Sequence, residues 1–90
     1  MNDLVSVETL NKIHLKISMN VKIQRQNKRV TQLSLALAMG HKTAGLVAFA
    51  EAGINNKHFN IEHLATIAKI LDISIIELFD GVDKILKKSD

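Results

Sequence analysis

Residues 31–53 read TQLSLALAMGHKTAGLVAFAEAG, and this stretch decides the fold that the sequence predicts. Thr31 precedes an apolar run as a helix N-cap would, because its hydroxyl can accept a hydrogen bond from a free N–H of the first turn. Gly40 is typical of a helix end, where the chain leaves through positive φ. A second short helix is expected from residue 42 or 43 to about residue 52, with Gly53 closing it. The prediction is two short helices joined by a tight turn.

The spacing of five residues in this stretch matches the helix-turn-helix pattern. An alanine lets two helices cross closely, a glycine makes the turn, and two apolar residues seat the second helix on the core. With the glutamine that opens the pattern, these residues are Gln32, Ala36, Gly40, Leu46 and Phe49. In this arrangement the outer face of the second helix is left for the major groove of DNA.

Three segments, in order, resemble phage-repressor-like regulators, the Xre-type or lambda-repressor-like family. Residues 31–36 (TQLSLA) are similar to that family's Ser-Gln-x-x-Leu-Ala opening, residues 51–53 (EAG) to its Glu-Arg-Gly, and residues 61–79 to its last two helices. The resemblance covers about residues 17–80. It implies sequence-dependent binding of double-stranded DNA by a small transcriptional regulator, a homodimeric repressor on a two-fold site.

Two rotations of the second helix are open, because the Glu-x-Gly segment lies one residue late. Without an insertion in the turn, Leu46 and Phe49 face the core and Thr43 faces DNA. With one additional turn residue, Thr43 is the N-cap, Val47 and Ala50 face the core, and the two larger side chains look outward. We prefer the first alternative, because burying each of the larger side chains contributes about 1.5–3 kcal/mol.

Composition limits the chain to a few classes of protein. Its 90 residues form one domain, residues 1–90, and the absence of cysteine excludes a disulfide framework, a thiolate zinc site and a cysteine nucleophile. No apolar run approaches the ~18 residues that a membrane span needs. Acidic residues stand where a signal peptide would carry positive charge, so we expect a cytoplasmic protein with no membrane association.

The charges are distributed unevenly along the chain. Residues 9–50 contain no Asp or Glu and seven basic residues, whereas the remainder is mildly acidic. Such asymmetry favours a polyanionic partner. The seven are Lys12, Lys16, Lys22, Arg25, Lys28, Arg29 and Lys42.

The segments on either side complete an all-α, compact five-helix domain. Residues 13–24 alternate between apolar and polar, which indicates a strand. The segment also fits a helix that begins at about Val7 with Ser6 as N-cap, and we favour this helix. Residues 1–16 are expected as an N-terminal extension. Asn60 is expected to cap a helix over 61–71, whose predicted inner face is Ile61, Leu64, Ala65, Ala68 and Leu71.

The C-terminal segment begins with a capping-box pattern from Ser74 to Glu77. It predicts a fifth helix that continues past Gly81, with residues 80–90 as a helical tail. An apolar stripe in this segment is longer than so small a monomer needs, so we expect it to form a homodimer interface through Ile75, Ile76, Phe79, Val82, Ile85 and Leu86.

The expected DNA contacts cluster in and around residues 31–57. Thr31 and Gln32, with backbone amides, are expected to hold a phosphate. The start of the second helix is expected to enter the groove, a following loop to grip the flanking backbone, and two cations to add positive field. These sets are His41, Lys42, Thr43 and Ala44; Asn55, Asn56 and Lys57; and Lys28 and Arg29.

Other features limit what this surface can do. The second helix lacks the Arg, Gln and Asn that read guanine and adenine, so phosphate contacts and DNA shape carry more weight. By the resemblance, Arg25 and Glu51 are expected to form a structural ion pair. No histidine pair has helical zinc spacing and no catalytic motif appears, so we expect no metal, no cofactor and no enzyme activity.

Two alternative functions remain open. One is the DNA-binding antitoxin of a toxin–antitoxin pair, which would have a toxin or another regulator as its protein partner. The other is a protein-interaction module, in which the fold is retained and the apolar face of residues 44–50 docks another protein.

Overall fold

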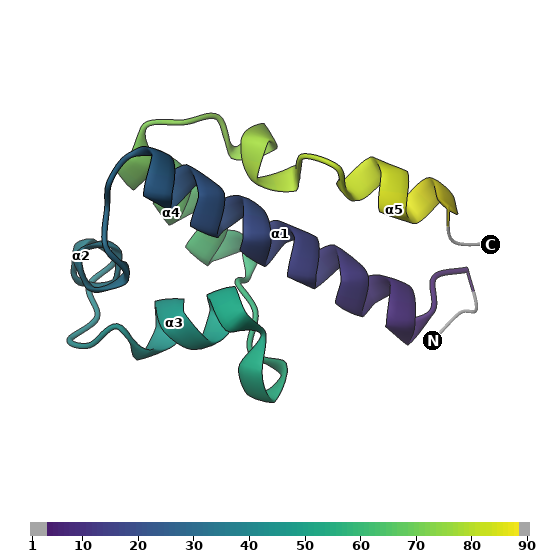
Figure 1. Ribbon diagram of the computed structural model, residues 1–90, viewed down its shortest axis with the longest axis horizontal. Coiled ribbons are helices and arrows are strands. Elements are labelled where there is room, and N and C mark those ends of the chain that lie inside the picture. The colour runs from purple at the N-terminus through teal and green to yellow at the C-terminus, as the bar shows by residue number, and fades with distance from the viewer. Residues whose placement is uncertain (1–3, 89–90) are drawn as a thin grey trace.

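The structure is a computed structural model that describes residues 4–88, and all its regular elements are helical. They are α1 (Val7–Asn27), α2 (Gln32–Ala38), α3 (Gly45–Ala52), η1 (Ile54–Asn56), α4 (Ile61–Leu71), η2 (Ile75–Phe79) and α5 (Val82–Lys88), where η marks a 3₁₀ helix. α1 crosses the whole molecule, with α2 and α3 on one side and η2 and α5 on the other (Figure 1). The prediction of an all-α fold is confirmed for the described residues.

The N-terminal segment is helix and not strand. Ser6 caps α1, and its hydroxyl accepts a hydrogen bond from the Thr9 N–H at 3.0 Å. Residues 7–16, which the sequence assigns to an N-terminal extension, form the first half of α1, and α1 contacts α5. Residues 1–3 and 89–90, the ends of the predicted extension and tail, lie outside the described residues.

The core lies between α1 and the elements that surround it. Each of α1, α2, α3, α4 and η2 contributes at least one side chain with no solvent exposure. These side chains are Val21, Leu35, Ala36, Val47, Ala50, Ile67 and Leu78.

The rotation of α3 differs from the one we preferred. Val47 and Ala50 are fully buried, whereas Phe49 is 47% exposed and Leu46 is only half-buried. The helix begins at Gly45 with Ala44 as N-cap, so Thr43 lies in the turn and is neither a DNA-facing helical residue nor the N-cap.

α4 begins and ends as predicted, but its inner face is rotated. Asn60 caps the helix. Ile61 and Ala65, predicted to face the core, are exposed, and Ile67 is buried in their place. Phe59, the residue directly before this cap, is also buried and belongs to the core.

The C-terminal segment is not one continuous helix. Ser74 forms the predicted capping box with Glu77, but the helix that follows is a short 3₁₀ helix that ends before Gly81, whose φ is +83°. A residue in that conformation cannot continue a right-handed helix, so α5 starts anew and packs along α1.

This break changes the predicted dimer stripe. Ile75, Phe79 and Val82 pack against the core of their own chain, and Ile85 is half-buried. Ile76 and Leu86 are exposed. The six residues therefore do not form one exposed face, because the turn at Gly81 separates η2 from α5.

No helix among residues 4–88 is long and apolar enough to cross a membrane.

Candidate nucleic-acid interface

The unit formed by α2, residues 39–44 and α3, here the α2–α3 unit, is held on α1 by a buried ion pair. Arg25 Nε donates to Glu51 Oε2 at 2.7 Å and its Nη2 donates to Glu51 Oε1 at 3.0 Å. Both side chains are nearly inaccessible, with 8% and 2% exposure. The expected pair is present, but it is a buried bidentate pair that fixes the rotation of α3 against α1.

Three further hydrogen bonds extend this anchor. Arg25 Nη1 donates to the Val30 carbonyl at 2.7 Å, and Gln32 Nε2 donates to Glu51 Oε1 at 3.0 Å. The Ser18 hydroxyl donates to the Ala50 carbonyl at 2.8 Å. Every buried side-chain nitrogen or oxygen in residues 4–88 has a hydrogen-bond partner. The anchor is therefore fully satisfied and can support a rigid surface.

Gln32 and Thr31, both predicted to contact a phosphate, form hydrogen bonds within the protein. The Gln32 amide that was expected to reach a phosphate donates to Glu51. The Thr31 hydroxyl caps α2, accepting from the Ser34 N–H at 3.0 Å and donating to the Ser34 hydroxyl at 2.9 Å. Both side chains thus shape the start of α2, and their contact with a phosphate stays a prediction.

The turn before α3 presents the accessible polar groups that were predicted there. His41, Lys42 and Thr43 are exposed and Ala44 is half-buried. Gly40, with φ of +92°, reverses the chain, and the His41 N–H donates back to the Ala36 carbonyl at 2.9 Å. The structure therefore brings these predicted residues together at the N-terminal end of α3.

The remaining predicted contacts are exposed on either side of the unit. Asn55, Asn56 and Lys57 follow the C-terminus of α3, and both asparagines have positive φ. Lys28 and Arg29 lie between α1 and α2. Lys42 precedes α3 and Lys57 follows η1, so each end of the helix has an exposed cation a few residues away in the sequence.

The outward face of α3 carries no charge and no hydrogen-bonding side chain. At about 100° per residue, the side opposite the buried Val47 holds Gly45, Ala48, Phe49 and Ala52. Phe49 and Ala52 are exposed and the other two are half-buried. The polar and charged side chains predicted for this surface therefore lie before and after α3 in the chain and not on the outward face of the helix.

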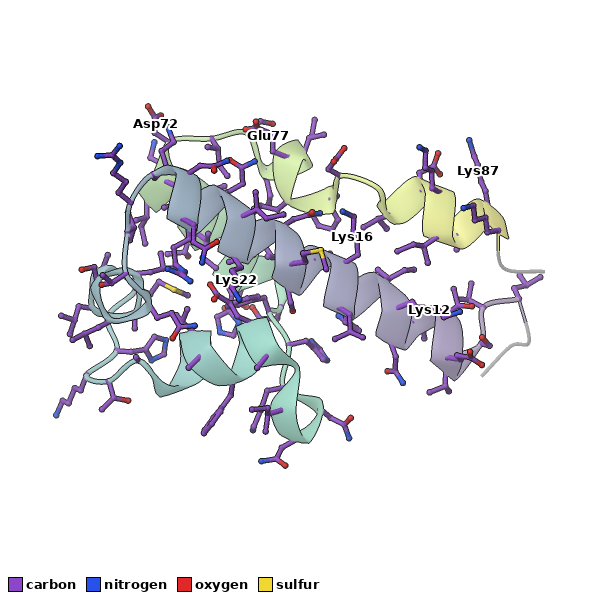
Figure 2. The ribbon with its side chains drawn as sticks, in the orientation of Figure 1. Lys12, Lys16, Lys22, Asp72, Glu77 and Lys87 are labelled. Carbon is purple, nitrogen blue, oxygen red and sulfur yellow. The ribbon has the colours of Figure 1, made fainter. Side chains whose placement is uncertain are left out.

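Acidic side chains gather elsewhere. Asp72 and Glu77 lie on the side of α1 away from α3, whereas Lys22 lies between α1 and α3 in the same view (Figure 2). Lys16 is directed toward Gly81, because a Cβ added there would lie 2.6 Å from its Cε. Glu51, the acidic residue of α3, is neutralised by Arg25. The exposed cations on and next to the α2–α3 unit are Lys28, Arg29, Lys42 and Lys57, whereas Glu62 on α4 is an exposed carboxylate.

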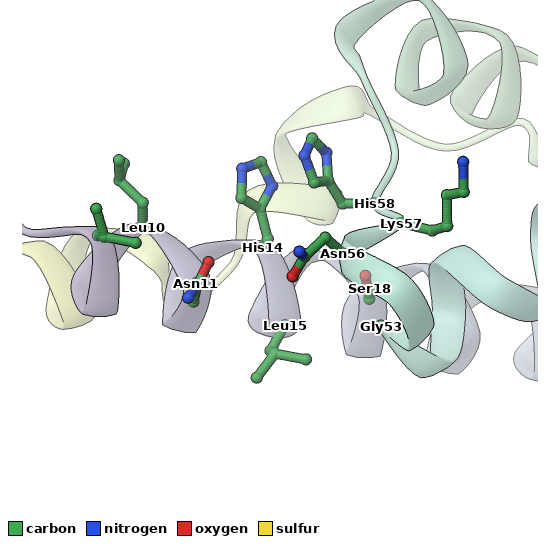
Figure 3. A pocket seen from close by; sticks show the side chains of 10 residues that line it. Leu10, Asn11, His14, Leu15, Ser18, Gly53, Asn56, Lys57 and His58 are labelled. Carbon is green, nitrogen blue, oxygen red and sulfur yellow. The ribbon is translucent and has the colours of Figure 1, made fainter.

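A groove of about 400 Å³ beside η1 contains a histidine pair that sequence reasoning missed. The His14 and His58 rings stack with centroids 3.7 Å apart (Figure 3). Burial, and then the neighbouring His58, lower the pKa of His14. The two residues are 44 positions apart in the sequence, so no local spacing could have revealed the contact. The part of the chain that the structure describes holds no cluster of three metal-ligating side chains.

A second histidine, His63, has a pKa that a predicted DNA residue lowers. Burial lowers the pKa of His63, and His41 lowers it further while Glu62 raises it. The chain matches no protein-family model, no curated protein and no solved structure.

Proposed function

We propose that this protein binds duplex DNA through the α2–α3 unit, acting as a helix-turn-helix module of a homodimeric transcriptional regulator. The observation that carries the proposal is the charge around α3. Exposed Lys42 precedes it and exposed Lys57 follows it, α1, which carries the exposed Lys22, packs against it, and its carboxylate, Glu51, is neutralised by Arg25. A rigid helix inside a cationic surface suits the phosphates on both sides of a groove.

The proposed binding depends mainly on the DNA backbone. Lys42, Lys57, Lys28 and Arg29 are exposed long cations that can contact phosphates, and phosphate contacts fix position without reading sequence. Because α3 has no side chain that forms bidentate hydrogen bonds to bases, the affinity is expected to be strongly salt-dependent and only weakly sequence-dependent.

The salt dependence of binding tests this proposal. Fluorescence anisotropy with a random-sequence duplex between about 50 and 200 mM salt should give a log–log slope near −4 to −5 if about 4–6 phosphates are contacted. Lys42→Gln should reduce the slope by about one. Lys87→Gln is the matched control, because Lys87 lies on α5 and pairs with Asp83. A protein that shows no duplex binding at the lowest salt concentration would refute the proposal.

Homodimerisation, which a two-fold DNA site requires, is part of the proposal. Ile76 on η2 and Ile23 on α1 are both exposed and line one shallow groove. We propose this pair as the apolar centre of the dimer contact, in place of the full predicted stripe. Sedimentation equilibrium at tens of micromolar protein should give a dimer for the natural chain and a monomer for Ile76→Asp; a monomeric natural chain would remove the dimer from the proposal.

One observation favours a second function, a protein-interaction module. Phe49 is large, apolar and 47% exposed on a helix whose neighbouring residues are small. Aromatic residues of this kind are enriched at the centres of protein interfaces. This alternative predicts that Phe49→Ala leaves duplex affinity unchanged, whereas a major-groove role predicts a loss.

A further inference from the structure

The exposed aromatic ring of Phe49 stands out on its helix. The residues around it on the same face are Gly45, one turn earlier, Ala48 and Ala52. None reaches as far from the helix axis as the phenyl ring. The ring is 47% exposed although Val47 and Ala50 on the opposite side are completely buried. Phe49 therefore contributes little to the core and projects from α3.

The rotation that exposes this ring is fixed from behind. The Ser18 hydroxyl donates a hydrogen bond to the Ala50 carbonyl, and Arg25 donates to the Glu51 carboxylate. These contacts act on the two residues that follow Phe49, so α3 cannot rotate to bury the ring without breaking them. The aromatic face of α3 is thus built into the fold.

The charge around this face indicates what it contacts. Lys22, Lys42 and Lys57 lie beside or beyond α3. An apolar ring inside a cationic surface suits a partner that presents an apolar patch between two rows of negative charge. The major groove of DNA is such a partner, because the 5-methyl group of thymine projects into it between the phosphates.

We infer that Phe49 is a specificity-determining residue that contacts the 5-methyl groups of thymine in the major groove. The small side chains at Gly45, Ala48 and Ala52 let the helix backbone approach the base edges. An apolar face cannot distinguish guanine from adenine by hydrogen bonds, but it does distinguish thymine from bases that lack the methyl group. The inference rests on the proposed DNA binding and adds to it the feature of the DNA that is read.

Replacing thymine by uracil tests the inference, because it removes only the methyl group. Two duplexes of one A·T-rich sequence, one with thymine and one with uracil throughout, are titrated with the protein by anisotropy at fixed salt. Each lost methyl contact should weaken binding about fourfold. Phe49→Ala should bind the two duplexes equally. Met19→Ala, which removes a similarly exposed apolar side chain on α1, should retain the preference for thymine.

The possible results separate the inference from the proposed function. Equal affinity of the natural protein for both duplexes, with salt-dependent binding retained, overturns the role of Phe49 and leaves DNA binding standing. No binding to either duplex overturns both. A second pair of duplexes, with cytosine or 5-methylcytosine, checks the source of the methyl group: a preference confined to 5-methylcytosine would overturn the assignment to thymine. Circular dichroism verifies that Phe49→Ala is folded.

Discussion

Replacing Arg25 by methionine should destabilise the fold more than any exposed substitution. Methionine retains much of the aliphatic bulk of Arg25 but removes three hydrogen bonds, two to Glu51 and one to the Val30 carbonyl. The Glu51 carboxylate, whose side chain is only 2% exposed, would then retain the Gln32 amide as its neighbour. An uncompensated charge would remain in the interior between α1 and α3.

The expected loss of unfolding free energy follows from this burial. Removing one partner of a buried ion pair costs about 3–5 kcal/mol, compared with about 0–1 kcal/mol for an exposed pair. For a chain of this length each kcal/mol lowers Tm by about 4–8 °C. Because small domains have only about 5–15 kcal/mol in total, Arg25→Met should bring the protein close to unfolding.

A double-mutant cycle makes the prediction quantitative. Urea unfolding followed by circular dichroism is measured for the natural chain, Arg25→Met, Glu51→Leu and the double variant. The double variant should be more stable than Arg25→Met, because it removes the buried charge together with its partner. Arg25→Met with a loss below about 1 kcal/mol, the range of an exposed pair, would refute the argument, as would strictly additive effects.

Three further perturbations follow from other contacts. Burial lowers the pKa of His14 and of His63 below 6.5, so the folded state binds these protons more weakly than the unfolded state. The free energy of unfolding should therefore be highest above about pH 6.5 and should fall as the pH decreases below it. The urea midpoint of the His14→Gln/His63→Gln double variant should depend less on pH than that of the natural chain. Asn20→Leu removes the amide that donates to two carbonyl oxygens at the end of η2, at 3.1 and 2.8 Å; unfolding free energy should drop by about 1–3 kcal/mol, and an unchanged urea midpoint would contradict the role of this contact. Gly81→Ala and Gly40→Ala each force alanine to positive φ and should each lose about 1–2 kcal/mol in thermal unfolding. The Gly81 variant should lose more, because its added Cβ meets a lysine side chain whereas nothing lies near the other; equal losses would show that the lysine moves freely.

The starts of α1, α2, α4 and η2 were predictable because capping is local. Ser6, Thr31, Asn60 and Ser74 each cap the element that follows, and each accepts a hydrogen bond from an N–H two or three residues later. A short sequence window contains everything that such an interaction needs. The same holds for the helix end at Gly40.

The rotation of α3 was not predictable from apolar area alone. Burying the larger side chains Leu46 and Phe49 favours one rotation, but Glu51 lies two residues after Phe49, so the two project about 200° apart. A helix that pairs Glu51 with a buried Arg25 must therefore turn Phe49 outward. The two predictions were incompatible, and the polar contacts determined the result.

The candidate site was predictable in its composition but not in its internal contacts. Exposed polar groups before and after α3 lie where the sequence placed them. The engagement of Gln32 by Glu51, and the stacking of His14 on His58, depend on how distant segments meet. Pattern reasoning on one sequence carries no information about such pairings when no spacing links the residues.

The polar side chains of α1 have a consequence for the order in which the protein can fold. Ser18, Asn20 and Arg25 bind partners that lie 26 to 60 residues further along the chain. During synthesis α1 therefore emerges long before the hydrogen-bond partners of these side chains. Until those partners are made, the three side chains remain hydrated, whether the segment is a helix or a coil. Asn20 obtains its last acceptor only when residue 80 has been made. Contacts of such long range slow folding relative to a purely local helical hairpin.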